Sequence, residues 1–198
     1  MAIGHYTPET RAERSGEIHQ KFVFGEVRTS DPDYQREARE LTARARAARR
    51  AVDPKAMIEL AKRYQPYKPD SREPVDPKAP LKQFPLALRN YLVKELSLKK
   101  DDILFWTMVG SLADTELGAD GIMEIRKPSG QSSVFIRLDL SIDRFAPVKK
   151  RLKSYEIVMI YGEIPDVHYE KAAFDTLVQK TGEDIIQKLK LAQYPVAK

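Results

Sequence analysis

The sequence contains no cysteine, which excludes disulfides, thiolate nucleophiles and metal sites held by cysteine sulfur. Any metal site must therefore use oxygen or histidine ligands. The three histidines, His5, His19 and His168, are scattered and lack the paired spacing of a ligand set. We expect each of them to be an ordinary surface or partly buried side chain.

Long apolar runs are also lacking. No stretch approaches the roughly 18 apolar residues of a membrane helix, and the first residues lack the apolar run of a signal peptide. We therefore expect a cytoplasmic protein that has no contact with a membrane. The sequence also has no glycine-rich phosphate loop and no nucleophile-elbow serine, which disfavours nucleotide kinases, Rossmann enzymes and classical hydrolase triads.

The charge balance is mildly basic. The chain has 34 lysines and arginines against 29 acidic residues, a formal net charge of +5. A basic surface attracts nucleic acid, because neutralising phosphates releases counterions. A surplus this small permits such contact without requiring it.

Positive charge is concentrated in the first half, where residues 34–52, YQREARELTARARAARRAV, carry six arginines. Alanines and the absence of glycine and proline predict a helix, with Asp31 or Asp33 as its cap. Its apolar stripe is narrow and mostly alanine, so the helix should bury little. The arginines form either a solvated face or a surface that contacts phosphates. The candidate phosphate contacts are Arg44, Arg46, Arg49 and Arg50.

A second short helix is predicted from its N-cap Asp53 to Tyr64. Six prolines then fall between residues 66 and 85, which is typical of an extended, semi-rigid linker. We place a domain boundary near residue 80. Residues 1–80 would form a basic, helical, proline-rich arm that adds little to the core, and residues 81–198 the main domain.

The second half of the chain alternates between helical and strand patterns. We expect helices over residues 86–96, 146–153, 169–179 and 183–192, with strands over residues 103–109, 120–126, 134–143 and 156–161. The last strand follows a helix and therefore needs a crossover connection. The sequence thus predicts the α/β class, with a central mixed four-stranded sheet flanked by helices.

Two of these strands form a predicted hairpin that brings acidic residues together. Strict alternation over residues 134–143 places its aliphatic side chains on one face and Asp139 on the other. Matching this apolar face to that of residues 120–126 pairs Ile122 with Arg137 and fixes the register. In this register Asp120 lies directly across from Asp139.

Two carboxylates about 5 Å apart repel each other unless a cation or a proton lies between them. A hard ion such as Mg²⁺ or Mn²⁺ would fill that place, since such ions take oxygen ligands. Two simpler explanations stay open. Asp120 precedes a glycine near the start of its strand and can cap a turn, and Asp139 can pair with Arg137 or another basic residue.

The order of elements, with an aspartate on one hairpin strand and a second carboxylate on the next, resembles the PD-(D/E)xK nuclease superfamily. The resemblance covers residues 84–180 and implies a restriction-endonuclease-like fold. It further implies that Asp120 and Asp139 hold a metal ion that activates water for phosphodiester hydrolysis. Glu95, on the helix before the sheet, would match an acidic residue that some members add.

The sequence departs from the pattern of that superfamily at one position. The pattern has lysine two residues after the second carboxylate, where this chain has Ser141. Without lysine the attacking water and the developing charge lose a positive partner. Arg137 on the same face, or Lys149 or Lys150 from the next helix, would have to replace it. The neighbouring Lys150 and Arg151 are further candidate contacts to nucleic acid.

Two functions follow as expectations. The first is a Mg²⁺- or Mn²⁺-dependent nuclease that acts on nucleic acid, DNA rather than RNA. The alternative is an inactive subunit that binds nucleic acid or protein and docks onto a larger assembly through residues 1–80. A basic residue reaching the two aspartates would favour the enzyme, whereas a site blocked by Phe135 or Ile122 would favour the binding protein.

Overall fold

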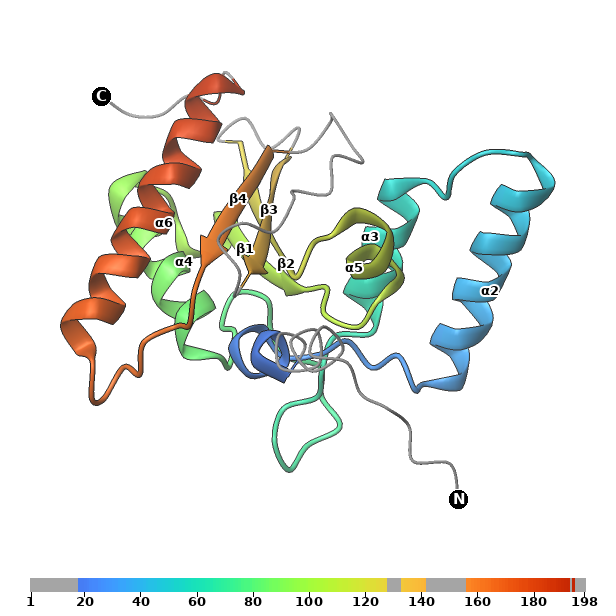
Figure 1. The fold of residues 1–198 in the computed structure, drawn as a ribbon, viewed down its shortest axis with the longest axis horizontal. Coiled ribbons are helices and arrows are strands. Elements are labelled where there is room, and N and C mark those ends of the chain that lie inside the picture. The colour runs from blue at the N-terminus through green and yellow to red at the C-terminus, as the bar shows by residue number, and fades with distance from the viewer. Residues whose placement is uncertain (1–17, 128–132, 142–155, 193, 195–198) are drawn as a thin grey trace, which may run out of the picture.

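The computed structural model describes residues 18–127, 133–141, 156–192 and 194 (Figure 1). Its centre is a four-stranded sheet of order β1-β2-β3-β4, which lies between two groups of helices. Strand β2 pairs antiparallel with β1 and β3, and β4 pairs parallel with β3. The predicted α/β class with a mixed four-stranded sheet flanked by helices is therefore confirmed. The likeness to restriction endonucleases stays a prediction.

The strands are β1 (Ile103–Thr107), β2 (Gly121–Arg126), β3 (Ser133–Ser141) and β4 (Glu156–Tyr161). The helices are α2 (Pro32–Ala47), α3 (Pro54–Arg63), α4 (Gln83–Glu95), α5 (Leu112–Leu117), α6 (Lys171–Leu191) and the short 3-10 helix η1 (Lys100–Asp102). Residues 18–24 are also helical. The predicted helix over residues 146–153 lies outside the described residues.

Both short N-terminal helices begin where their caps predict. The carboxylate of Asp31 accepts the amide of Asp33, and that of Asp53 accepts the amide of Lys55, while a proline takes the first helical position in each case. Of the residues in α2, Tyr34 and Ala45 are buried, which confirms that this helix contributes little apolar surface.

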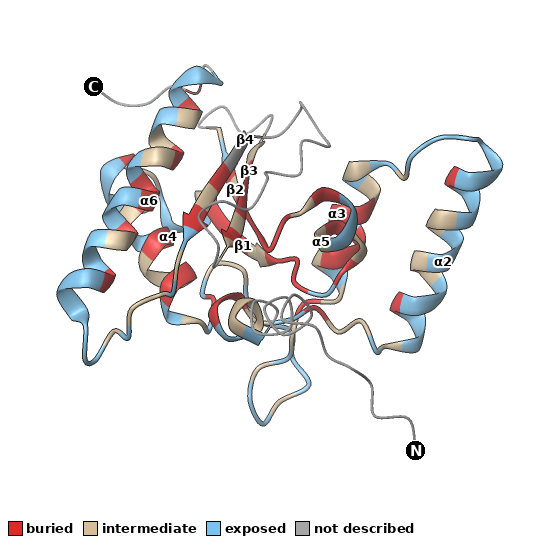
Figure 2. Cartoon of the chain, viewed as in Figure 1, coloured by how far each residue is buried: buried red, intermediate tan, exposed pale blue. Residues whose placement is uncertain are grey.

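Helices α4 and α6 cover one face of the sheet. The largest apolar cluster lies there and combines both helices with one side of every strand (Figure 2). Leucines four residues apart on α4 supply one side of this contact, as their helical spacing predicts. The fully buried members of the cluster include Leu88, Leu92, Ile103, Met123, Ile125, Ile136, Leu138 and Leu189.

Helix α6 is continuous through Thr181 and Gly182, where the sequence predicted a break between two helices. That prediction is wrong because Gly182 serves a close helix contact. A Cβ atom at Gly182 would lie 2.3 Å from Cδ1 of Tyr91 on α4. Glycine therefore allows the ring of Tyr91 to lie against the backbone of α6.

The opposite face of the sheet is covered by α3 and α5, with α2 packed outside them (Figure 1). Leu60 and Ala61 of α3 have no exposed surface, and they share a cluster with Ile122 of β2. The expectation that residues before the linker add little to the core is therefore wrong. Ile122 and the neighbouring Trp106 and Phe135 give the second face of the sheet an apolar part, which α3 covers. The division of the chain near residue 80 stays a prediction.

The proline-rich segment folds back on itself and covers the edge of β1. Tyr67 and Pro74 form an antiparallel bridge, so the predicted extended linker is wrong for this part of the chain. The carbonyl of Pro77 accepts the amide of Phe105 at 2.8 Å. The buried side chain of Gln65 bonds both the amide and the carbonyl of Thr107, each at 3.0 Å. These contacts satisfy backbone groups that an open edge strand would expose.

We predict that Gly182→Ala destabilises the protein, although alanine favours a helix by about 1 kcal/mol over glycine. The added methyl would displace the ring of Tyr91, and such overpacking costs about 1–3 kcal/mol. In a Tyr91→Ala background the same change should instead raise the free energy of unfolding. Urea denaturation of the four proteins of this cycle measures both effects. A stabilising effect of Gly182→Ala in the presence of Tyr91 would contradict the contact.

Candidate functional site

The register of the β2–β3 hairpin is the one that the sequence predicted. Ile122 pairs with Arg137, and Met123 with Ile136. The last pair of the ladder is Gly121 with Leu138, so the next residues in each direction are Asp120 and Asp139. Asp139 follows the alternation of Arg137, the partner of Ile122, on the face that α3 and α5 cover. The backbone of Asp120 bonds Leu138, which already pairs with Gly121, so the regular ladder does not continue to an Asp120–Asp139 pair.

Asp120 is tied to both neighbouring strands. Its amide donates to the carbonyl of Leu138 and its carbonyl accepts the amide of Met108, both at 2.9 Å. Its carboxylate oxygen Oδ2 accepts the amide of Leu140 at 2.6 Å, a charge-assisted bond, and the residue is only 2% exposed. The sheet thus fixes the position of this carboxylate, which satisfies a backbone amide of β3.

Asp139 is the more accessible of the two carboxylates. It is partly exposed and pairs with Met159 of the parallel strand β4. Ser141, which replaces the expected lysine, is also partly exposed and lies on the same face two residues further on. A ligand that reaches this end of the sheet would meet Asp139 before Asp120.

Arg137 lies on the same face but is completely buried. Its Nη1 donates to the carbonyl of Leu117 at the end of α5, at 2.7 Å. In this arrangement Arg137 has no surface from which to contact a substrate, because α5 covers it. An arginine keeps its charge when buried and requires compensating negative charge. Asp120 and Asp139 lie close in sequence to the Ile122–Arg137 pair, so their carboxylates can supply this negative charge.

Glu95 is not brought to this site. It is exposed at the end of α4, where its Oε1 lies 3.9 Å from Nζ of Lys94. Helix α4 packs on the face of Met123 and Ile136, opposite to that of Asp139, so this structure does not bring Glu95 to Asp139. In the described part of the chain no group of three acidic or histidine side chains is placed to hold a metal.

Three further predicted residues, Lys149, Lys150 and Arg151, lie outside the described residues. Phe135 and Ile122, the two side chains that could block the site, both lie in the described part of the chain. Ile122 is completely buried in the core, and Phe135 is partly buried against the same cluster. Both therefore belong to the packing of this face of the sheet.

A polar cluster that sequence reasoning missed surrounds Glu124 on this same face. Nζ of Lys62, from α3, lies 2.8 Å from Oε2 of Glu124, and their side chains are 11% and 13% exposed. The same oxygen accepts the indole Nε1–H of Trp106 at 3.0 Å, and Oε1 accepts the hydroxyl of Ser133 at 3.1 Å. Nζ of Lys62 also lies 4.8 Å from the ring centroid of Phe135. No local spacing links these residues, because Lys62 is far from the others in sequence.

Burial alone would raise the pKa of Glu124, but the bond and charge of Lys62, with the bonds from Trp106 and Ser133, hold this pKa below its ordinary value. A lowered pKa in the folded state stabilises the fold at neutral pH. That contribution is lost as the pH falls below the unfolded pKa and through the folded one.

We therefore predict that the free energy of unfolding falls as the pH drops below about 4.5, and that Glu124→Gln weakens this dependence. At neutral pH the substitution should cost about 3 kcal/mol, because it leaves Lys62 nearly buried without a counter-charge. Urea denaturation across a pH series measures both effects. Glu73→Gln is the matched control, because Glu73 pairs with Lys68 in solvent and should change stability little.

The arginines expected to contact phosphate lie at the end of α2 and in the turn after it, and all four are exposed: Arg44, Arg46, Arg49 and Arg50. No ion pair joins any of them to another described residue. Arg44 and Arg46 belong to the last turn, where positive charge also complements the helix dipole. Their position is consistent with a solvated face and with a surface for a polyanion.

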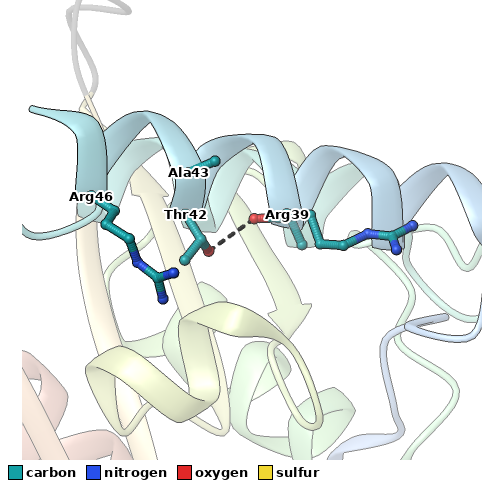
Figure 3. A pocket seen from close by; sticks show the side chains of 5 residues that line it. Arg39, Thr42, Ala43 and Arg46 are labelled. Carbon is teal, nitrogen blue, oxygen red and sulfur yellow. Dashed lines mark hydrogen bonds between the residues drawn. The ribbon is translucent and has the colours of Figure 1, made fainter.

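A hollow of about 360 Å³ lies along one side of α2 (Figure 3). The residues that line it are Ala38, Arg39, Thr42, Ala43 and Arg46. Figure 3 shows that these arginines extend in different directions instead of converging on one point. Cations spread along a helix suit an extended chain of phosphates better than a single small anion.

No protein-family model, curated protein or solved structure matches the chain. None of the described helices combines the length and the apolar character needed to cross a membrane.

Proposed function

We propose that the chain is a metal-dependent nuclease-like protein that binds nucleic acid through α2 and hydrolyses phosphodiester bonds at Asp120 and Asp139. The observation that carries the proposal is the register of β2 and β3. Asp120 and Asp139 are the next residues beyond the last pair of this ladder, and two carboxylates close together repel each other unless positive charge compensates them.

The donor set fits Mg²⁺ or Mn²⁺. Such ions take hard oxygen ligands and often use one or two carboxylates, completed by water and substrate phosphate. Asp139 would hold the ion from the accessible side, and Asp120 from the buried side. When bound, the ion would activate water and neutralise charge on the phosphate.

Residues around Asp120 and Asp139 would hold these carboxylates in position for metal binding. The amide of Leu140 fixes the carboxylate of Asp120, so little reorganisation is needed when an ion arrives. Arg137 would act as a positioning residue, since its buried charge moderates the repulsion between the two carboxylates. The exposed arginines of α2 would bind the phosphate backbone without reading its sequence.

A second candidate function is binding of nucleic acid without cleavage. Two observations favour it. Ser141 stands where the resemblance calls for lysine, and one oxygen of Asp120 already accepts the Leu140 amide. In this case the carboxylates and Arg137 would stabilise the sheet, and α2 alone would supply the interaction.

The two functions predict different outcomes in a cleavage assay on linear and branched DNA and RNA. With Mg²⁺ or Mn²⁺ we expect cleavage that chelator abolishes and that Asp139→Asn lowers by about 100-fold or more, because a metal ion supplies several kcal/mol. The control is Asp175→Asn, an exposed aspartate on α6 that pairs with Lys171. Cleavage that survives chelation or Asp139→Asn would end the nuclease proposal. Binding without cleavage in every condition would favour the second function.

The role of α2 is tested by replacing Arg44, Arg46, Arg49 and Arg50 with glutamine. We expect weaker binding to oligonucleotides of any sequence. The slope of log K against log salt should become shallower by about 0.9 for each duplex phosphate that the variant no longer neutralises. Fluorescence anisotropy over a salt series measures both. Glutamine at Lys171, Lys180, Lys188 and Lys190 of α6 removes the same charge and is the control. An equal weakening in both variants would show that net charge acts in place of a defined surface.

A further inference from the structure

Two apolar hollows lie next to each other on the surface and share Leu81 and Lys82. The first has a volume of about 290 Å³ and is formed between residues 22–23, the start of α4 and residues 164–168. The second measures about 400 Å³ and lies between residues 24–25, the proline-rich segment and β1. We call this surface, defined by Phe22, Tyr67, Leu81 and Lys82, the double hollow.

Large apolar side chains are exposed around both hollows. Phe22 is 75% exposed, Leu81 50% and Tyr67 42%. A single exposed apolar residue is ordinary, but a group of them bordering continuous hollows marks an interaction surface. The nuclease site does not explain this surface, since neither Asp120 nor Asp139 lines it.

Neighbouring cations hold two of these rings in place. The guanidinium carbon of Arg28 lies 3.9 Å from the ring centroid of Tyr67, and Nη1 of Arg28 donates to the Tyr67 hydroxyl at 2.7 Å. Nζ of Lys82 lies 5.3 Å from the ring centroid of Phe22. Aromatic side chains held in this way lose little conformational freedom when a partner binds.

The charge at the border of the two hollows is positive. Lys82 lines both hollows and forms no ion pair with any other described residue. The acidic residue in the lining, Asp166, is engaged locally, because its Oδ1 accepts the amides of His168 at 2.7 Å and Tyr169 at 3.1 Å. A partner carboxylate between the hollows would therefore meet a cation whose charge no described side chain neutralises.

We propose that the double hollow binds an acidic segment of a partner protein, in which one aspartate or glutamate lies between two bulky apolar side chains. Each apolar side chain enters one hollow, and the carboxylate pairs with Lys82. Nucleic acid is a poorer occupant, because the lining is mainly apolar and Lys82 is its one lysine or arginine. The exposed arginines that suit a phosphate backbone lie on α2 instead.

The test selects peptides from a displayed random library on the full-length protein. We expect enriched peptides with an acidic residue between two of Leu, Ile, Met, Phe or Trp. Selection on the Lys82→Glu variant should enrich a basic residue at the same position. Synthetic peptides from the first selection should bind Phe22→Ala and Lys82→Glu roughly tenfold more weakly or worse, as measured by fluorescence anisotropy.

Matched controls are Leu191→Ala, which removes another exposed apolar side chain, and Lys180→Glu, which reverses another surface charge; both should leave peptide binding unchanged. All substituted side chains are partly or largely exposed, and circular dichroism checks that each variant folds. Three outcomes would overturn the proposal. These are no enrichment, enrichment unchanged by Lys82→Glu, and a dimer in sedimentation that Phe22→Ala dissociates, which would make a second copy the occupant. Nuclease activity is measured separately, so failure here leaves the proposed function untouched.

Discussion

The pairing of β2 with β3 is the interaction on which the rest of the structure depends. Its register sends Met123 and Ile136 towards α4 and α6, and Ile122 towards α3 and α5. A shift by one residue would exchange the two faces and turn Asp139 into the main apolar cluster. The same pairing that builds the core also brings Asp120 and Asp139 to one end of the hairpin. A substitution that shifts the register of this hairpin would therefore disturb both the core and the candidate site.

Polar side chains inside the apolar layers fix how the other elements meet the sheet. Gln65 bonds both backbone groups of Thr107, and Nε of Arg89 donates to the carbonyl of Ile103 at 2.8 Å. Glu124 joins β2 to α3 through Lys62, and Arg137 joins β3 to α5. A buried polar group is costly unless its partner is in place, so these contacts disfavour other packings of the same helices.

The proposed functions occupy separate surfaces of one small fold. The carboxylates lie at one end of the β2–β3 hairpin, the exposed arginines lie on the outermost helix, and the double hollow lies where the proline-rich segment meets residues 22–25. A protein with this arrangement could hold a nucleic acid, act on it and remain attached to a partner. Because the surfaces share no residue, substitutions can separate the three roles.

The sequence by itself determined what depends on local repetition. Alternation with a period of two predicted the register of the β2–β3 hairpin, short apolar runs predicted β1 and β4, and the caps Asp31 and Asp53 predicted the starts of two helices. These features are local because neighbouring residues already decide which face each side chain takes. The expected pairing of Asp120 with Asp139 is not part of the observed ladder, which ends at Gly121 and Leu138.

Features that depend on contacts between distant segments became visible in the folded chain. The continuity of α6 requires Tyr91 against Gly182, the burial of α3 requires the second face of the sheet, and the enclosure of Arg137 requires α5. The sheet separates Glu95 from the aspartates because α4 covers the other face. Packing of this kind depends on partners far away in the sequence, so no local pattern records it.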